Sequence, residues 1–337
     1  MNEQKKTGTV QLFANGGLGF NIGAQLQAFC DNSVAGAAHL KIGYIDTSDS
    51  NMTDTIDASN CYFLPKTDGS GKNQGEHLDL IDQHAKQILQ KFPPSNDLNI
   101  VLSSAGGGSG AVISSTLASI MIEEGHNVIA IVVGSTGDLK EIRNTKNVIT
   151  TYQNVSDELG KPISMAYFQN SEATPQAKVD RAIVSLVGAL CVLFSRQNHG
   201  MDRQDLKHWL QFSEKKITNY GPRLALLSMF EGNQPLGDIG AVISVATLTN
   251  AQSGSGISQT PEYQCVGVIP DYADKVVIGA APVHFVNSTG KFASIKDSLD
   301  EMKKNIDRQR EALVEEESVN LAAVKGKANR RGIVVDD

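Results

Sequence analysis

The sequence has few cysteines, few aromatic residues and no long apolar run. Its four cysteines form no C-x-x-C pair, so neither a zinc site nor a disulfide framework is predicted, and a reducing cytoplasm fits this usage. No apolar run reaches the ~18 residues of a membrane span. The first residues lack the apolar core of a signal peptide. We therefore expect a cytoplasmic protein that does not bind membranes.

An excess of basic residues is also missing. The 337 residues include 30 Lys and Arg against 37 Asp and Glu, a net charge of −7. Nonspecific nucleic-acid binding needs many phosphate-neutralising cations, so no direct nucleic-acid partner is predicted. Hydrophobic residues make up 40% and charged residues 20%, which is typical of a globular protein with room for two domains.

The most informative stretch is a run of three glycines between two apolar segments. Residues 98–102 read as a buried strand, and residues 112–124 have apolar positions at helical spacing. Glycines let the backbone approach an anion, and the helix N-terminus supplies free N–H groups. A tight turn without a ligand is the alternative, but it does not need three glycines. The predicted phosphate-binding residues are Ala105, Gly106, Gly107, Gly108, Ser109 and Gly110.

A second glycine-rich turn follows a predicted strand at residues 9–13 and leads into a helix that ends near Phe29. This glycine pattern by itself is not specific, because it occurs in dinucleotide-binding folds and also in many turns that bind no ligand. Its candidate binding residues are Gly16, Gly17, Gly19 and Asn21.

Two further polar segments, of which only the first follows an apolar run, are candidates for contacts with a nucleotide. Asp46 and Thr47 come directly after residues 40–45, where they can contact a ribose, a phosphate or a hydrated magnesium ion, and a solvated turn fits equally well. Residues 67–75 contain Gly-Ser-Gly-Lys, but Asn73 stands where a P-loop has Ser or Thr. We therefore predict only a flexible loop, able to close over a γ-phosphate.

Strands and helices alternate through the first half of the chain. A strand at residues 127–133, a helix at 139–159 and a strand at 163–168 extend the pattern, which predicts a parallel sheet covered on both faces. Four or five polar or glycine-rich loops then converge on one edge of the sheet, which favours a nucleotide. The helix at residues 174–197 is almost wholly apolar at its centre and is expected to be buried on all sides.

The second half of the chain predicts a smaller mixed sheet. Four runs rich in β-branched residues, at 223–230, 241–248, 264–269 and 282–287, precede a long charged helix. The predicted division is a nucleotide-binding domain at 1–173, a connecting helix at 174–198, a mixed-sheet domain at 199–290, a C-terminal helix at 291–324 and a tail at 325–337.

Asp202 and Asp205 open a short helix just after the apolar helix. Carboxylates three residues apart share one face of a helical turn and complement the helix dipole. N-capping by Asp202 explains them without any catalytic role, and the residues alone favour that reading.

In this order, these motifs resemble the tubulin/FtsZ superfamily. Residues 105–110 match its GGG[TS]G phosphate loop, and residues 16–21 are similar to its first nucleotide loop. The apolar helix matches its central helix, and Asp202-x-x-Asp205 is similar to its catalytic loop, although Gly200 replaces the family's usual Asn. Residues 197–212 resemble the tubulin-like proteins of large bacteriophages, the PhuZ group.

The resemblance implies a Rossmann-like α/β GTPase that binds GTP or GDP and assembles head to tail. Magnesium is then held mainly through the GTP phosphates and water. Asn170 reads the guanine, and Arg143, Asn144 and Asp180 assist. Asp202 and Asp205 reach the γ-phosphate of the next subunit and activate the attacking water.

The resemblance also implies a cellular role. It suggests filaments that position phage DNA in the cytoplasm of an infected bacterium. Separately, the mixed charge and apolar residues of the tail at residues 325–337 suggest an arm that docks on a neighbouring subunit, and a disordered terminus fits equally well. Plasmid segregation or cell division by a related filament remains an alternative. So do a non-hydrolysing structural relative and an NAD-dependent oxidoreductase.

Overall fold

The computed structural model describes residues 7–31, 36–171, 173–213, 217–232, 235–250, 257, 259–269 and 281–324. The chain divides into two compact units, Met1–Phe292 and Ala293–Asp337. The predicted tail at residues 325–337 lies outside the described residues.

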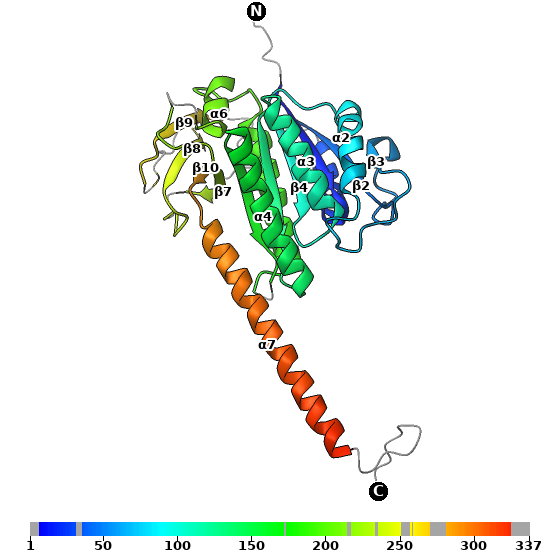
Figure 1. The fold of residues 1–337 in the computed structure, drawn as a ribbon. Helices are drawn as coiled ribbons and strands as arrows, with labels where there is room; N and C mark the ends of the chain where they lie inside the picture. Colours follow the sequence, from blue (N-terminus) through cyan, green and yellow to red (C-terminus); the bar gives the residue numbers. More distant parts are fainter. Residues whose placement is uncertain are drawn as a thin grey trace, which may run out of the picture. The chain divides into compact units, whose positions relative to one another are not determined.

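The first unit is built on a ten-stranded sheet in the order β3-β2-β1-β4-β5-β6-β7-β10-β8-β9 (Figure 1). The first six strands pair in parallel, as the alternating pattern predicts. They are β1 (Thr9–Asn15), β2 (His39–Asp46), β3 (Cys61–Phe63), β4 (Leu98–Ser104), β5 (Val128–Gly134) and β6 (Ile163–Gln169).

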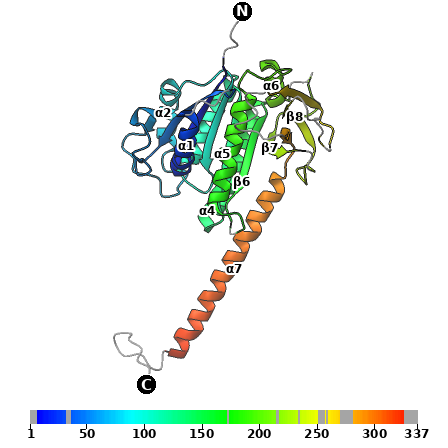
Figure 2. The same ribbon diagram turned by 180° about the vertical axis from the view of Figure 1, so that it is seen from behind.

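Helices cover both faces of the parallel strands. Helices α2, α3 and α4 lie in front of the sheet in Figure 1, and α1 and α5 lie in front of it in the reverse view of Figure 2. The two helix layers sandwich strands that are buried throughout, such as β5. The bounds are α1 (Gly16–Asp31), α2 (Leu78–Lys91), α3 (Ser109–Glu123), α4 (Leu139–Leu159) and α5 (Gln176–Leu193).

Helix α5 is the apolar helix of the sequence. Every residue from Leu186 to Leu193 is buried, which confirms the expected burial of its centre. It stops before Ser195, whose carbonyl accepts a hydrogen bond from the Gly8 N–H at 3.0 Å. The end of α5 is thereby fixed beside the start of β1.

The remaining strands continue the same sheet. β7 (Leu224–Glu231) pairs in parallel with β6, while β10 (Val283–Ser288) pairs antiparallel with both β7 and β8 (Val242–Thr249). β9 (Tyr263–Val268) closes the edge in parallel with β8. The mixed strands thus extend the parallel sheet, and the predicted domain division at residues 173 and 198 stays a prediction. The short elements here are η1 (Ala58–Asn60) and α6 (Arg203–Leu210).

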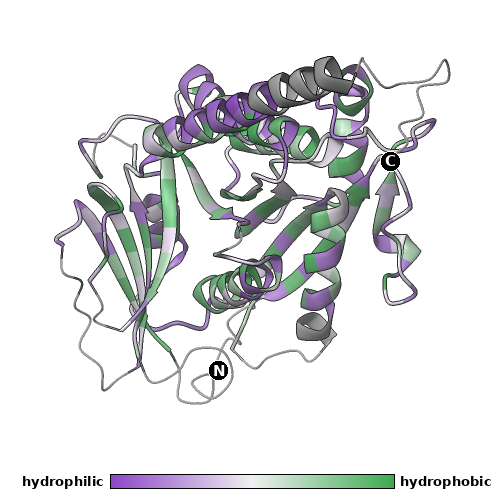
Figure 3. Cartoon of the chain, turned by 90° about the horizontal axis from the view of Figure 1, so that it is seen from below, coloured by the Kyte–Doolittle hydropathy of each residue, from purple (hydrophilic) through white to green (hydrophobic). Residues whose placement is uncertain are grey.

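Helix α7 (Phe292–Val324) carries most of the described part of the second unit. Its part at residues 292–311, whose side chains are described, is mostly hydrophilic, whereas the strands of the first unit are mostly apolar (Figure 3). Across the described helices, none combines the length and apolar character needed to cross a membrane.

Candidate functional site

Two glycine-rich segments meet at the carboxyl edge of the sheet. β1 and β4 are neighbouring parallel strands, so the segments that follow them emerge side by side. A Cβ on Gly110 would lie 2.9 Å from the Asn15 carbonyl oxygen and 3.0 Å from the Gly16 Cα. Only glycine at position 110 permits this close approach.

The contact brings two helix N-termini together. α1 begins at Gly16 itself, with φ +68°, so the first glycines form the opening turn of the helix and not a separate loop before it. α3 begins at Ser109 without a side-chain cap from Gly108. N–H groups at the starts of two helices therefore face one region, as anion binding requires.

A buried carboxylate lies beside these helix starts. Asp46, 5% exposed, accepts hydrogen bonds from the Thr47 N–H at 2.7 Å and from Asn51 Nδ2 at 3.2 Å. Thr47 Oγ1 donates to Ser109 Oγ at 2.9 Å, which links the end of β2 to the start of α3. Burial raises the pKa of Asp46, although these hydrogen bonds oppose the shift. In the folded protein, burial therefore disfavours the charged form of Asp46, and this lowers the stability at neutral pH.

This cost predicts a pH-dependent effect of Asp46→Asn. A carboxyl whose pKa is raised by folding stabilises the protein while protonated, and this contribution is lost as the pH rises through its range. The free energy of unfolding of Asp46→Asn relative to that of the wild type should therefore increase as the pH rises from about 4 to 7. Urea unfolding across that range measures the difference.

Asp57→Asn is the control, for which the stability relative to the wild type should change with pH in the opposite direction. Hydrogen bonds from the Ser59 backbone lower the pKa of Asp57, so removing that carboxylate should cost stability as the pH rises. Unfolding curves for Asp46→Asn and wild type that stay parallel from pH 4 to pH 7 would contradict the account.

The polar loop at residues 67–75 folds over the triple glycine. The Ser109 N–H donates to Ser70 Oγ at 2.9 Å, and Gln74 Nε2 donates to the carbonyls of Ala105 and Gly107 at 3.3 and 3.4 Å. Asn144 Nδ2, from α4, donates to the carbonyls of Lys72 at 2.9 Å and of Gly106 and Gly107, each at 3.1 Å. Asn144 thus ties the polar loop to the glycine loop.

Lys72 supplies a cation at the same edge. Its Nζ forms ion pairs with Glu141 and, at 2.9 Å, with Asp138, which caps α4. The hydrogen bonds to Glu141 and Asp138 raise the pKa of Lys72. A charged ammonium is therefore maintained beside the glycine loop.

The glycine loop, the polar loop and the starts of α1 and α4 line an open pocket of about 340 Å³, which is within the size range of small-molecule sites. Asn170 lines it, and its Oδ1 is buried without a hydrogen-bond partner among the described residues. Asn21 Nδ2 donates to Asp180 Oδ2 at 3.0 Å, and burial raises the pKa of Asp180. The lining residues are Gly17, Leu18, Asn21, Lys72, Ser104, Gly106, Gly107, Ser135, Glu141, Asn170 and Gln176.

The predicted binding residues are distributed unevenly around this pocket. Gly19 serves the packing of α1, because a Cβ there would collide with the Ala14 backbone. Arg143 is exposed on α4 and does not line the pocket. Lys72, Glu141 and Gln176 also line the pocket but are not among the residues predicted from the sequence, although the Gly-Ser-Gly-Lys segment was an available signal for Lys72.

Asp202 and Asp205 lie at the opposite edge of the sheet. Asp202 caps α6, accepting from the N–H groups of Gln204 at 2.7 Å and Asp205 at 3.0 Å, and Asp205 Oδ2 accepts from the Asp202 N–H at 2.8 Å. The N–H donors of Asp205 and Gln204 lower the pKa of Asp202, so this carboxylate is charged at neutral pH. The structure therefore confirms that Asp202 caps α6, as the residues alone suggested.

The two edges are separated by the length of a strand. Arg203 of α6 donates to the carbonyl of Asn96, just before β4, and β4 leads at its other end into the triple glycine. A seven-residue strand spans about 20 Å. Figure 1 shows α6 at the amino ends of the strands. The acid pair therefore cannot reach the pocket of its own chain.

No protein-family model matches the chain. It is 26% identical to a phage tubulin-like protein of Pseudomonas phage PhiPA3, over 90% of this chain and 94% of that protein. A protofilament of TubZ from bacteriophage PhiKZ superposes with a TM-score of 0.78 and 25% identity, over 97% of this chain and 99% of that one. The chain is similar to phage tubulin-like proteins, which belong to the tubulin/FtsZ superfamily.

The solved phage tubulin PhuZ with GDP has the same fold as this tubulin-like chain. Its TM-score is 0.80 at 21% identity, over 97% of this chain and 99% of that one. Together these relatives confirm the predicted resemblance and the predicted α/β fold with its mostly parallel sheet.

Proposed function

We propose that this tubulin-like protein is a GTPase that polymerises head to tail and hydrolyses GTP at the contact between subunits. The observation that carries the proposal is the placement of the glycine loops and the acid pair at opposite edges of one sheet. A head-to-tail contact brings the acid pair of one subunit to the pocket of the next. Such a heterologous contact repeats into a filament wherever successive subunits do not close a ring.

The residues at the carboxyl edge fit a guanine nucleotide. The N–H groups of residues 105–110 and of the start of α1 would hold the phosphates, and the Asn170 amide would read the guanine. Mg²⁺ would be held mainly by phosphate oxygens and water, with Asp46 and Thr47 as the nearest protein oxygens. Among the described residues no cluster of three His, Cys, Asp or Glu forms a complete metal site.

The acid pair adds an exposed, charged carboxylate, whereas Glu141 of the pocket is paired with Lys72. Asp202 and Asp205 would orient the attacking water or accept its proton at the γ-phosphate of the neighbouring subunit. The related proteins support this reading, because one is a protofilament and another holds GDP.

For the cellular role, we propose that the filaments position phage DNA in the cytoplasm of an infected bacterium, in line with the phage origin of the relatives. A plasmid-segregation or division filament is the second candidate, since the same pocket would serve either cargo. An NAD-dependent oxidoreductase accounts for the first glycine turn but not for the acid pair at the opposite edge.

Light scattering of the purified protein tests the proposed function. GTP should produce a rise that ATP and GDP do not, because the Asn170 amide selects guanine and assembly needs the γ-phosphate. No rise with any nucleotide, at protein concentrations well into the micromolar range, would leave a binding site without a polymer. A change in NADH fluorescence on adding the protein would show NADH binding and would favour the oxidoreductase.

The tail gives a separate prediction. Residues 325–337 combine basic, apolar and acidic groups, and we propose that they dock on a neighbouring subunit. A chain truncated after Gly326 should need a higher critical concentration to polymerise, measured by pelleting at several protein concentrations. Equal critical concentrations for the truncated and full-length chains would show that the tail does not contribute to assembly.

A further inference from the structure

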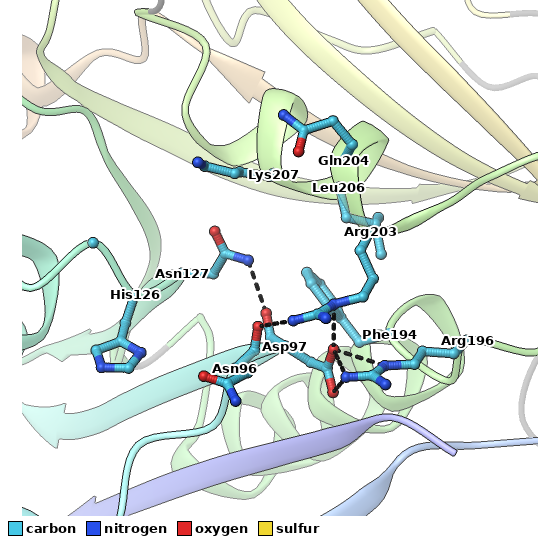
Figure 4. Close-up of a pocket in the computed structure, with 11 residues that line it drawn as sticks. Asn96, Asp97, His126, Asn127, Phe194, Arg196, Arg203, Gln204, Leu206 and Lys207 are labelled. Atoms are coloured by element: carbon cyan, nitrogen blue, oxygen red, sulfur yellow. Dashed lines mark hydrogen bonds and ion pairs between the residues drawn. The ribbon is translucent and has the colours of Figure 1, made fainter. Parts of the chain in front are cut away.

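Asp97, at the amino edge of the sheet just before β4, is the shared partner of two arginines. Its side chain is 5% exposed. Arg196 donates from Nε and Nη2 to Asp97 Oδ1, at 2.9 and 2.7 Å, and from Nη2 to Oδ2 at 2.9 Å. Arg203 Nε lies 3.2 Å from the same Oδ1. Figure 4 shows the two guanidinium groups converging on this one carboxylate.

The same carboxylate is fixed to the sheet. The Thr9 N–H, at the start of β1, donates to Asp97 Oδ2 at 3.0 Å, and Asn127 Nδ2 donates to the Asp97 carbonyl at 2.9 Å. Asp97 is thus held by the neighbouring segments of the sheet as well as by the two arginines.

The two arginines bracket the loop that carries the first acid. Arg196 lies just past the end of α5, Arg203 is the first residue of α6, and residues 197–202 run between them. Arg196 has φ +61°, a left-handed conformation that is unfavourable for a residue with a Cβ. Such a conformation persists where surrounding contacts hold it, and the bidentate ion pair with Asp97 is such a contact.

Charge explains why the two ends of the loop need Asp97 to stay together. Two guanidinium groups on one carboxylate oxygen lie close enough to repel each other. The neighbouring pocket of about 290 Å³ is lined by a further cation, Lys207, and by no carboxylate other than Asp97. Removing the negative charge of Asp97 should therefore drive Arg196 and Arg203 apart.

We propose that Asp97 is a positioning residue for the acid pair: through Arg196 and Arg203 it fixes the loop at residues 197–202, and with it the place where Asp202 and Asp205 meet the next subunit. The inference rests on the proposed function. Asp97 itself does not touch the nucleotide, since β4 separates it from the pocket.

The effect on hydrolysis should be large while GTP binding stays unchanged. The capping box of Asp202 and Asp205 is internal to α6, so loss of Asp97 displaces the acid pair as a unit without dismantling it. A displacement of about 1 Å at a reacting centre can cost a hundredfold in rate. We expect Asp97→Asn to slow hydrolysis at least tenfold at a given amount of polymer.

Mixed filaments test the inference, because they separate the two faces of a subunit. Wild-type subunits loaded with radiolabelled GTP are diluted into an excess of carrier subunits loaded with GTPγS. Each labelled nucleotide then meets the acid face of a carrier. Labelled phosphate released per pelleted subunit is measured for wild-type, Asp97→Asn, Asp202→Ala and Lys207→Ala carriers.

Hydrolysis should be fast with wild-type and Lys207→Ala carriers and slow with Asp202→Ala and Asp97→Asn carriers. Labelled Asp97→Asn subunits in wild-type carrier should hydrolyse at the wild-type rate, because their own pocket is intact. If labelled GTP is hydrolysed as fast with the Asp97→Asn carrier as with the wild-type carrier, but slowly with the Asp202→Ala carrier, the positioning role of Asp97 is wrong and the proposed function stands. A fast Asp202→Ala carrier overturns the proposed function.

A second pair of variants covers a folding failure of Asp97→Asn. The Arg203 side chain is 55% exposed, so Arg203→Gln removes one arm of the pair with little risk to the fold. An Arg203→Gln carrier should slow labelled hydrolysis, and Arg203→Lys, which keeps the charge, should restore part of it. Equal rates for the three carriers with wild type, Gln and Lys at position 203 would contradict the proposal.

Discussion

Asp202→Ala should reduce GTP hydrolysis by at least a hundredfold and leave filaments that form with GTP but no longer disassemble. General acid–base groups contribute roughly 10²–10⁴-fold to rate, and Asp202 is exposed and charged at neutral pH. Phosphate release and light scattering, followed together after GTP addition, measure both effects. GTP binding should be unchanged, because Asp202 is a strand's length from its own pocket.

Asp202→Asn separates catalysis from capping. An Asn at this position still accepts hydrogen bonds from the N–H groups of Gln204 and Asp205, so α6 keeps its cap but loses the carboxylate. We expect Asp202→Asn to hydrolyse GTP as slowly as Asp202→Ala. Wild-type hydrolysis by Asp202→Asn would show that the residue only caps the helix.

Gly110→Ala should weaken GTP binding at least tenfold. The added methyl group would meet backbone atoms of Asn15 and Gly16 at 2.9 and 3.0 Å, and a backbone cannot rotate away as a side chain can. Overpacking of this kind costs about 1–3 kcal/mol, here imposed on the contact between the two glycine segments that would hold the phosphates. Equilibrium binding of a fluorescent GTP analogue measures the change.

Gly221→Ala is the matched control. A Cβ on Gly221 would have no atom within 4 Å, so this change should leave binding unaffected. Thermal unfolding of both variants shows whether Gly110→Ala is folded at the assay temperature. Wild-type affinity in a folded Gly110→Ala would mean that the nucleotide does not depend on this contact.

Local sequence patterns predicted the elements of this fold well. The triple glycine, the apolar centre of α5 and the long helix at 292–324 each depend on residues close together in the chain. The structure has helices at the latter two, and the triple glycine lies between β4 and α3 as expected. The three-residue strand β3 was missed, since it is too short to show a periodic pattern. The glycine-rich segment at residues 16–21 was predicted as a turn that leads into a helix, but α1 already begins at Gly16.

Contacts between distant segments could not be predicted in the same way. Nothing local in residues 223–230 indicates that β7 pairs with β6 and so continues one sheet. The contacts of Ser70 and Gln74 with the glycine loop cross more than thirty positions, and Arg196 is 99 positions from Asp97. Such pairs are fixed by the packing of the whole sheet.

The most direct test of the account is the GTPase rate per subunit as a function of protein concentration. A site completed by the next subunit predicts almost no hydrolysis below a threshold and a steep rise above it. That threshold should coincide with the critical concentration found by pelleting. A rate per subunit that stays constant on dilution through this concentration would show that one chain hydrolyses GTP alone, and it would contradict the division of the site between two subunits.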